Sequence, residues 1–196
     1  IDVNCLIFDK PSYSGTDAEP FFSGFNGGGE FFLLRRKAKD LLPVEYYALN
    51  PAFIRFSSGT TGASKGVLLS HESIIERTDA ADSALCMTSE DVVIWVLSMS
   101  YHFVVTILLF LRRASTIVLC GNAFLESFIE NIKNRKGTFT YASPFHYHLL
   151  SNSEGIPSDL FSGVRIAIST AMKLPQSTAG EFFDKFGVEL SEAYGI

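Results

Sequence analysis

The sequence has few cysteines, few basic residues and little charge overall, and each shortage argues against a class of protein. Its three cysteines, Cys5, Cys86 and Cys120, contain no CxxC pair and are too scattered for a disulfide framework. We therefore expect a protein of the reducing cytoplasm. The 16 Lys and Arg residues against 21 Asp and Glu residues give a formal net charge of -5. That balance leaves no basic stripe for nucleic-acid phosphates, so we expect no nucleic-acid partner.

Long hydrophobic runs are also missing. The longest, residues 103–111, ends at Arg112 and Arg113 and is much shorter than the ~20 residues that a membrane-spanning helix needs. No basic and apolar leader opens the chain, so we expect neither a transmembrane segment nor a secretory signal. With 47% hydrophobic and 19% charged residues, the 196-residue chain can build a core and is not a disordered one.

Short apolar runs alternate with stretches of helical periodicity over most of the chain. The expected strands are 53–56, 66–69, 92–97, 115–120, 138–142, 164–168 and 188–190. The expected helices run from about 70–73 to 85, then over 103–111, 123–136, 144–150 and 175–186. Ser73 and Glu76 have capping-box spacing at the start of the first of these helices. Strands that are apolar throughout must be covered on both faces, so the pattern predicts an α/β fold: a mostly parallel sheet with helices on both faces.

The first 50 residues give a weaker pattern. Residues 24–29 are loop-like, 31–36 suit either a strand or a helix, and 37–50 could form a linker. We see no internal repeat and no clear domain boundary. We therefore expect residues 1–50 to be an irregular N-terminal segment of the same domain as residues 51–196.

The most informative stretch is a glycine-rich segment between the first two of these expected strands. It reads Ser57, Ser58, Gly59, Thr60, Thr61, Gly62, Ala63, Ser64, Lys65, Gly66, Val67. Glycines allow backbone amides to approach a ligand, and hydroxyls and a lysine suit phosphate oxygens. The spacing matches neither GxxxxGK[ST] nor GxGxxG. By composition alone, a phosphate cradle and a flexible hydrophilic hairpin are equally good interpretations.

The order of these residues resembles the phosphate-loop motif [ST]SGTTGxPKGV of the acyl-adenylate-forming superfamily, which includes the acyl-CoA synthetases. Ten of the eleven positions fit, and Ser64 stands where the family usually has proline. The resemblance implies that Ser57, Ser58, Gly59, Thr60, Thr61, Gly62 and Lys65 bind the phosphates of ATP. Serine in place of proline removes a fixed φ and should make the loop more mobile without abolishing binding.

A second match follows the expected strand 92–97. Tyr101, His102 and Phe103 lie where the family lines its acyl pocket, although the family's proline-leucine turn is absent. The resemblance therefore implies an acyl-binding role for these three residues. The alternative is that His102 caps the apolar helix 103–111, which is the commoner role of a single histidine beside an apolar run.

Two more matches lie near the end of the chain. Residues 169–174 resemble the family's Ser-Gly-Ala-x-Pro-Leu turn, and Tyr194 with Gly195 resembles its Tyr-Gly-x-Thr-Glu motif. The resemblance implies that Ser169, Thr170, Ala171, Tyr194 and Gly195 bind the adenine and the acyl group, with Tyr194 stacked on the adenine. Thr170 and Lys173 depart from the pattern, and a β-branched Thr170 in place of glycine should narrow the ligand's approach.

The resemblance covers residues 51–196, so we expect an AMP-binding subdomain within the large N-terminal domain of a longer enzyme. The family's Mg²⁺-binding Thr-Glu pair would follow Ile196, and its ribose-binding acid and C-terminal domain with the adenylation lysine would come later. We therefore assign no catalytic or metal-binding residue to this chain. By itself it should be inactive and should self-associate through apolar surface that the missing parts normally cover.

The function that the resemblance implies is ATP-dependent activation of a carboxylic acid to acyl-AMP, followed by thioester formation with coenzyme A. No Asp or Glu occurs between Val92 and Leu125 to pair with a substrate ammonium group, which favours a fatty or aromatic acid over an amino acid. Two alternatives remain: a non-catalytic nucleotide- or acyl-binding module, suggested by Ser64, Thr170 and Lys173, and an amino-acid adenylation domain.

Overall fold

The structure is a computed structural model that describes residues 5–8, 18–23, 30–35, 44–56, 66–121 and 124–194. It describes the three strands before residue 36, and Ser100, Tyr101 and Val105, by their backbone alone. The chain divides into two compact units, Ile1–Asn50 and Pro51–Ile196. None of the helices in these described ranges is long and apolar enough to cross a membrane.

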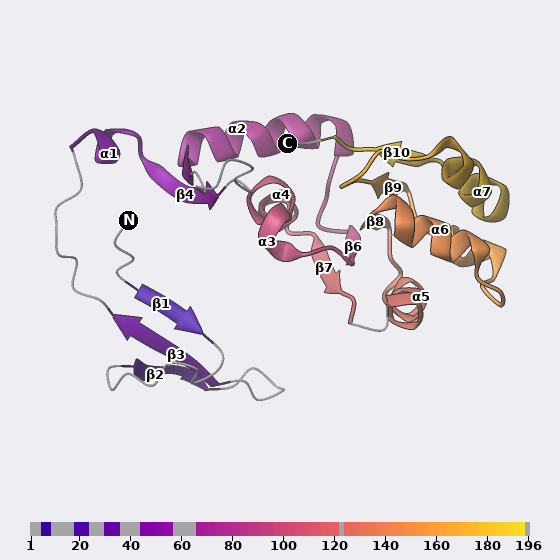
Figure 1. The fold of residues 1–196 in the computed structure, drawn as a ribbon, viewed down its shortest axis with the longest axis horizontal. Helices are drawn as coiled ribbons and strands as arrows, with labels where there is room; N and C mark the ends of the chain where they lie inside the picture. The colour runs from indigo at the N-terminus through magenta and orange to yellow at the C-terminus, as the bar shows by residue number, and fades with distance from the viewer. Residues whose placement is uncertain are drawn as a thin grey trace, which may run out of the picture. The chain divides into compact units, whose positions relative to one another are not determined.

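The first unit contains an antiparallel three-stranded sheet in the order β1-β3-β2 and one short helix (Figure 1). Its elements are β1 (Cys5–Phe8), β2 (Ala18–Ser23), β3 (Glu30–Arg35) and α1 (Val44–Ala48). Residues 31–35 of the ambiguous run 31–36 are therefore a strand, paired on both sides, and residue 36 lies outside the described residues.

The second unit opens with a two-stranded antiparallel ribbon, β4 (Pro51–Phe56) and β5 (Gly66–Ser70). Phe56 pairs with Gly66, so the glycine-rich segment connects two strands that meet at its ends, as the sequence predicts. Helix α2 (His71–Leu85) follows at once. Its N-cap is Ser70, whose Oγ accepts from Ser73 N at 3.1 Å, so the capping box expected at Ser73 is wrong.

A five-stranded parallel sheet forms the centre of this unit, in the order β10-β9-β8-β6-β7. Its strands are β6 (Val92–Trp95), β7 (Thr116–Leu119), β8 (Phe139–Ala142), β9 (Ile166–Ser169) and β10 (Leu190–Glu192). The expected strands are present, and the last two, β9 and β10, each begin two residues later than the sequence suggests. The predicted α/β class with a mostly parallel sheet is confirmed.

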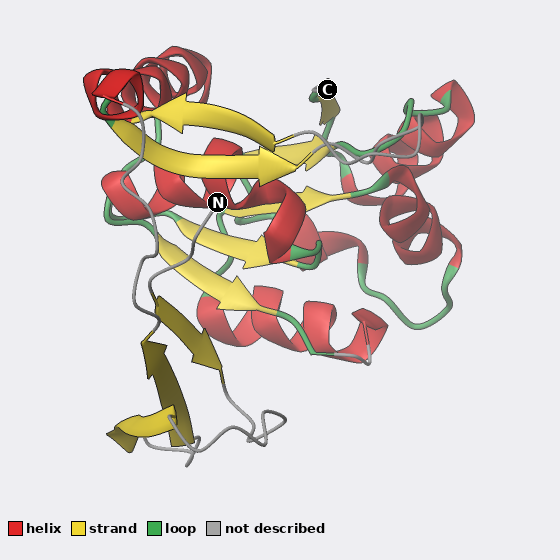
Figure 2. Cartoon of the chain, turned by 60° about the vertical axis from the view of Figure 1, so that its left-hand side comes forward, coloured by secondary structure: helices red, strands yellow, loops and turns green. Residues whose placement is uncertain are grey.

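Helices cover both faces of this sheet (Figure 2). On one face lie α5 (Phe124–Arg135), α6 (Pro144–Asn152), the 3₁₀ turn η2 (Ser158–Phe161) and α7 (Gln176–Phe186). On the other lie α2, the π-helical turn η1 (Phe103–Ile107) and α4 (Leu108–Arg112). Adjacent strand residues alternate between the two cores, with Ile94 and Ala142 in one and Val93, Trp95 and Tyr141 in the other.

Candidate active site at the carboxyl edge of the sheet

Strands β6, β8, β9 and β10 are parallel neighbours, so their carboxyl ends lie along one edge of the sheet. This edge is where ligands bind in open α/β sheets. Helix α3 (Met99–His102) follows β6, residues 169–171 end β9, and Tyr194 follows β10. The parallel topology therefore brings together at one edge three segments that are up to 95 positions apart in the sequence (from Met99 to Tyr194).

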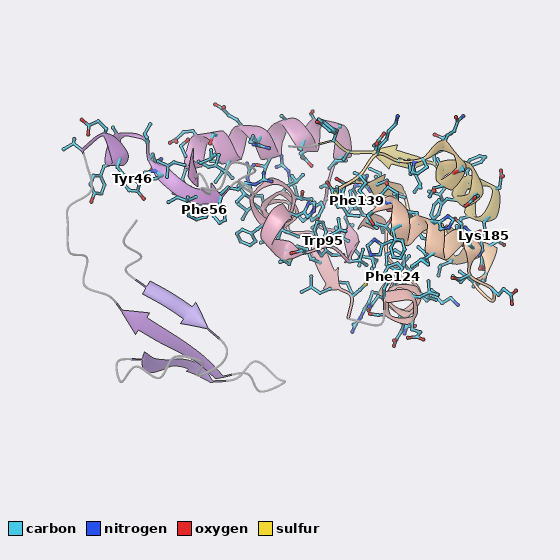
Figure 3. The ribbon with its side chains drawn as sticks, viewed as in Figure 1. Tyr46, Phe56, Trp95, Phe124, Phe139 and Lys185 are labelled. Atoms are coloured by element: carbon cyan, nitrogen blue, oxygen red, sulfur yellow. The ribbon has the colours of Figure 1, made fainter. Side chains whose placement is uncertain are left out.

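An aromatic wall forms the β6 end of this edge. The single tryptophan, Trp95, which is labelled in Figure 3, is fully buried. It stacks on Tyr141 of β8, with ring centroids 5.1 Å apart. The His102 ring meets both edge-on, at 5.3 Å from Trp95 and 5.7 Å from Tyr141. We call Trp95, His102 and Tyr141 the aromatic wall.

Burial lowers the pKa of His102 below its ordinary value, and the positive charge of Arg55 on β4 acts in the same direction. His102 is therefore a neutral imidazole at pH 7, with the packing role of an aromatic ring. Its side chain makes no capping hydrogen bond to the described turn that follows, and the helical segment begins earlier, at Met99. The contacts thus give no support to the capping alternative.

Phe103 opens the π-helical turn that follows the wall. Its ring lies 6.1 Å from that of Phe53 on β4, so the ribbon packs beside this turn. Isolated π turns widen a helix locally and occur often at functional sites. The sequence predicts a buried helix here, which is correct, but gives no sign of the wider turn.

The end of β9 is fixed by hydrogen bonds to its neighbours. Thr170 N donates to Ala142 O at 3.0 Å, and Thr170 Oγ1 donates to Ala193 O at 3.1 Å. The Thr170 side chain is therefore turned into the fold, against the expectation that it narrows the approach of a ligand. Ala171 has φ 73°, a left-handed conformation that costs free energy in a non-glycine residue and occurs often at binding sites.

Ser169 is fully buried, and its Oγ has no hydrogen-bond partner among the described residues. Buried hydroxyls are nearly always paired. With no partner among the described residues, this hydroxyl at the carboxyl edge is a candidate to bind a ligand group or an ordered water molecule.

A cleft of about 390 Å³ opens beside these residues. It is lined by Ala171, Met172, Lys173, Glu192, Ala193 and Tyr194. Glu192 Oε1 accepts from Leu174 N at 2.8 Å, which ties the turn after β9 to β10. Tyr194 is 88% exposed, so its ring is available for stacking with a planar group. The size suits a small organic ligand.

The structure places the predicted residues in two groups along this edge. His102 and Phe103 lie at the β6 end, while Ser169, Thr170, Ala171 and Tyr194 lie at the β9–β10 end. The loop residues Ser57, Ser58, Gly59, Thr60, Thr61, Gly62 and Lys65, together with Gly195, lie outside the described residues, and Tyr101 is described by its backbone only.

Sequence reasoning missed several residues of this edge. Trp95 and Tyr141 read only as strand residues, and Met172 and Glu192 only as neighbours of the motifs. One signal was available: both ring residues lie near the carboxyl ends of apolar runs, where a parallel sheet presents ligand contacts.

Comparison with known proteins gives a consistent result. The family model described as "AMP-binding enzyme" matches residues 23–196. The long-chain-fatty-acid–CoA ligase of Haemophilus influenzae is 26% identical over 157 residues, which cover 74% of this chain and 27% of the ligase. The 4-coumarate–CoA ligase 1 of Petroselinum crispum is 30% identical over 148 residues, which cover 72% of this chain and 27% of that protein.

Solved structures agree with the fold. The crystal structure of apo MatB from Rhodopseudomonas palustris has a TM-score of 0.68 at 24% identity, over 76% of this chain and 30% of that one. A malonyl-CoA ligase with methylmalonyl-CoA and AMP bound has a TM-score of 0.67 at 25% identity, over 76% and 33%. The chain thus spans about a quarter to a third of its relatives' length. The match over residues 23–196 shows that the chain belongs to the AMP-binding enzyme family.

Proposed function

We propose that this chain is the AMP-binding part of a longer acid–thiol ligase that converts a carboxylic acid and ATP to acyl-AMP and pyrophosphate. A thiol, most simply that of coenzyme A, then attacks the acyl carbonyl and releases AMP. The observation that carries the proposal is the family match over residues 23–196, together with the phosphate-loop motif at 57–67. Its matched relatives are named as CoA ligases.

Each segment of the edge has a part in this proposal. The hydroxyls, amides and Lys65 of residues 57–65 bind the β- and γ-phosphates, where the hydrogen-bond donors and the positive charge of Lys65 stabilise the departing pyrophosphate. Tyr194 stacks on the adenine in the cleft beside β10, and Ser169 and Ala171 border the acyl-adenylate. Tyr101, His102 and Phe103 border the acyl tail, with His102 in the aromatic wall.

The resemblance also implies Mg²⁺. The described residues contain no group of three or more His, Cys, Asp or Glu side chains that could hold a metal ion. They therefore do not fit a complete metal site, and we derive no step through the metal.

The substrate acid carries no ammonium group, because residues 92–125 contain no carboxylate that could pair with such a group. A fatty or aromatic tail suits the aromatic wall. Thr170, which motivated a degenerate, non-catalytic module, is bonded to Ala193 O and does not line the cleft. The enzyme is therefore the better interpretation, and we place it in the cytoplasm, where scattered thiols stay reduced.

Product analysis tests this proposal. The full-length enzyme is incubated with ATP, Mg²⁺, coenzyme A and a panel of carboxylic acids, and the products are identified by mass spectrometry. Formation of acyl-CoA together with AMP is expected for at least one acid. Formation of ADP and phosphate, or acyl-AMP that coenzyme A does not consume, would contradict the proposed reaction or its thiol acceptor.

A further inference from the structure

Arg55 lies on β4, two residues before the glycine-rich segment, and is half-buried. Alternate residues of a strand share a face, so Arg55 is on the same face as Phe53. The Phe53 ring contacts that of Phe103, which directly follows His102. The positive charge of Arg55 also acts on the His102 ring and contributes to the lowered pKa of His102. Arg55 is thus a cation beside the aromatic wall.

Among the described residues, no carboxylate forms an ion pair with Arg55. Within the described part of the chain, no hydrogen bond or ion pair joins Arg55 to another residue. Asp79, Asp82 and Asp91 are already paired with other arginines. Residues 92–125 carry no carboxylate, and the neighbouring imidazole is neutral. A half-buried guanidinium that no described residue pairs with is a candidate to bind a negatively charged ligand group, because burying an unpaired charge costs free energy.

We infer that Arg55 binds a second carboxylate at the far end of the acyl tail, so that the substrate is a dicarboxylic acid. The inference rests on the proposed function and names its substrate class. A guanidinium and a carboxylate match in a planar, bidentate geometry. The absence of carboxylates that excludes an ammonium group here also leaves this cation available. The tail is therefore apolar along its length and anionic at its end, which refines the expected fatty or aromatic acid.

The position along the sheet favours the distal carboxylate over the reacting one. In the proposed function the acyl-adenylate lies against Ser169 and Ala171 at the end of β9, and the aromatic wall lies at β6, with β8 between these two strands. Two strand spacings of about 4.8 Å separate β9 from β6 by ~10 Å. A carboxylate joined to AMP at one end cannot also reach Arg55, whereas a tail of several methylene groups can.

Pyrophosphate exchange by the full-length enzyme with octanoic and octanedioic acids, which have equal length, tests the inference. The wild type should prefer octanedioic acid. Arg55→Leu should lower kcat/KM for octanedioic acid roughly 10- to 100-fold, the usual range for a lost charge-assisted contact. It should leave or raise kcat/KM for octanoic acid, and Arg55→Lys should retain part of the preference. Arg135→Leu on the exposed surface of α5 is the matched control and should change neither value.

Other results would overturn the inference. An equal loss with both acids and a higher KM for ATP would assign Arg55 to the nucleotide. Equal kcat/KM values for both acids in the wild type would show that no cation binds the end of the acyl tail. If none of the acids supports exchange, the proposed function itself is overturned. If Arg55→Leu does not fold, titration of the wild type followed by Trp95 fluorescence decides: a response to octanedioic acid at lower concentration is expected, and equal responses contradict the inference.

Discussion

Asp91 is the residue at which three strands of the parallel sheet are tied together, at the edge opposite the site. Its carboxylate accepts from Arg165 Nε at 2.8 Å and Nη2 at 2.7 Å, from Thr138 Oγ1 at 2.8 Å and from Thr88 N at 2.9 Å. Thr138 precedes β8 and Arg165 precedes β9. These bonds, chiefly those from Arg165, lower the pKa of Asp91 from 3.8 to about 2.

We predict that Asp91→Asn lowers the free energy of unfolding by about 2 kcal/mol at pH 7, since it weakens a charged, nearly buried hydrogen-bond network. Because the carboxyl pKa is depressed in the folded state, wild-type stability should also fall as the pH drops from about 4 to about 2. Denaturant titration at several pH values measures both effects. Asp79→Asn, in an ion pair that is 47% exposed on the Asp79 side, should change little. Equal stability of Asp91→Asn and wild type would show that the network is not stabilising.

His102 gives the second prediction at the scale of single residues. His102→Ala removes an imidazole that packs against Trp95 and Tyr141, and so enlarges the proposed acyl pocket. The full-length variant should shift its preference toward bulkier or longer acids by roughly tenfold in relative kcat/KM, which is typical of a change in pocket volume. His148→Ala, whose side chain is 53% exposed on α6, is the control. An unchanged order of acids with activity intact would make His102 a packing residue only.

At the scale of elements, helix α6 ends on a lysine from α7. Lys185, labelled in Figure 3, lies on α7. Its Nζ donates to the carbonyls of Leu150, Ser151 and Ser153 at 2.8–3.0 Å. These carbonyls have no intrahelical partner, and a cation also suits the negative end of the helix dipole. The bonds therefore join α6 and α7 on one face of the sheet.

Lys185→Met keeps most of the apolar stem and removes the ammonium group. We expect it to lower the free energy of unfolding by roughly 1–3 kcal/mol, because three partly buried carbonyls lose a charged donor. Thermal unfolding followed by circular dichroism measures the change. Lys133→Met, on the exposed surface of α5, should be nearly neutral. Equal unfolding temperatures for the two variants would show that water satisfies the three carbonyls as well as the lysine does.

The elements that sequence reasoning predicted well are those with local causes. The periodicity of residues 123–136 gives α5, and Pro144 opens α6 as its position predicts. The capping box at Ser73 failed because β5 runs on to Ser70, whose hydroxyl reaches Ser73 N first. The π turn and the wall of Trp95, His102 and Tyr141 depend on contacts between distant segments, which no local pattern contains. Arg55 was missed for the same reason, since β4 meets Phe103 only in the folded chain.

At the scale of the whole molecule, apolar side chains remain on the surface of the second unit. The largest exposed ones include Phe56, Val67, Leu111, Leu119, Phe145, Met172 and Phe183. The chain also spans only about 27% of the first matched relative. In the proposed enzyme, other parts of the protein would cover some of these side chains, because proteins seldom expose large apolar patches.

The isolated 196-residue chain should therefore self-associate and should not form acyl-AMP. Apolar burial favours association, while losing even one group that stabilises developing charge typically costs ~10²–10³ in rate. Light scattering should detect a dimer or a larger species, and ATP with a fatty acid should release no pyrophosphate. A strictly monomeric chain would contradict the exposed-surface argument, and measurable turnover would show that this chain already contains the groups needed to form acyl-AMP.

The central claim is that residues 57–67 serve an acid-activating site. Isotope exchange between pyrophosphate and ATP, measured with the full-length enzyme and a panel of acids, tests it most directly. The wild type should catalyse exchange that depends on the acid, and Lys65→Ala should reduce the rate by at least tenfold with a melting temperature within about 1 °C, since a loop lysine adds little stability. If no acid of the panel supports exchange, or if the rate is unchanged in Lys65→Ala, the claim is contradicted.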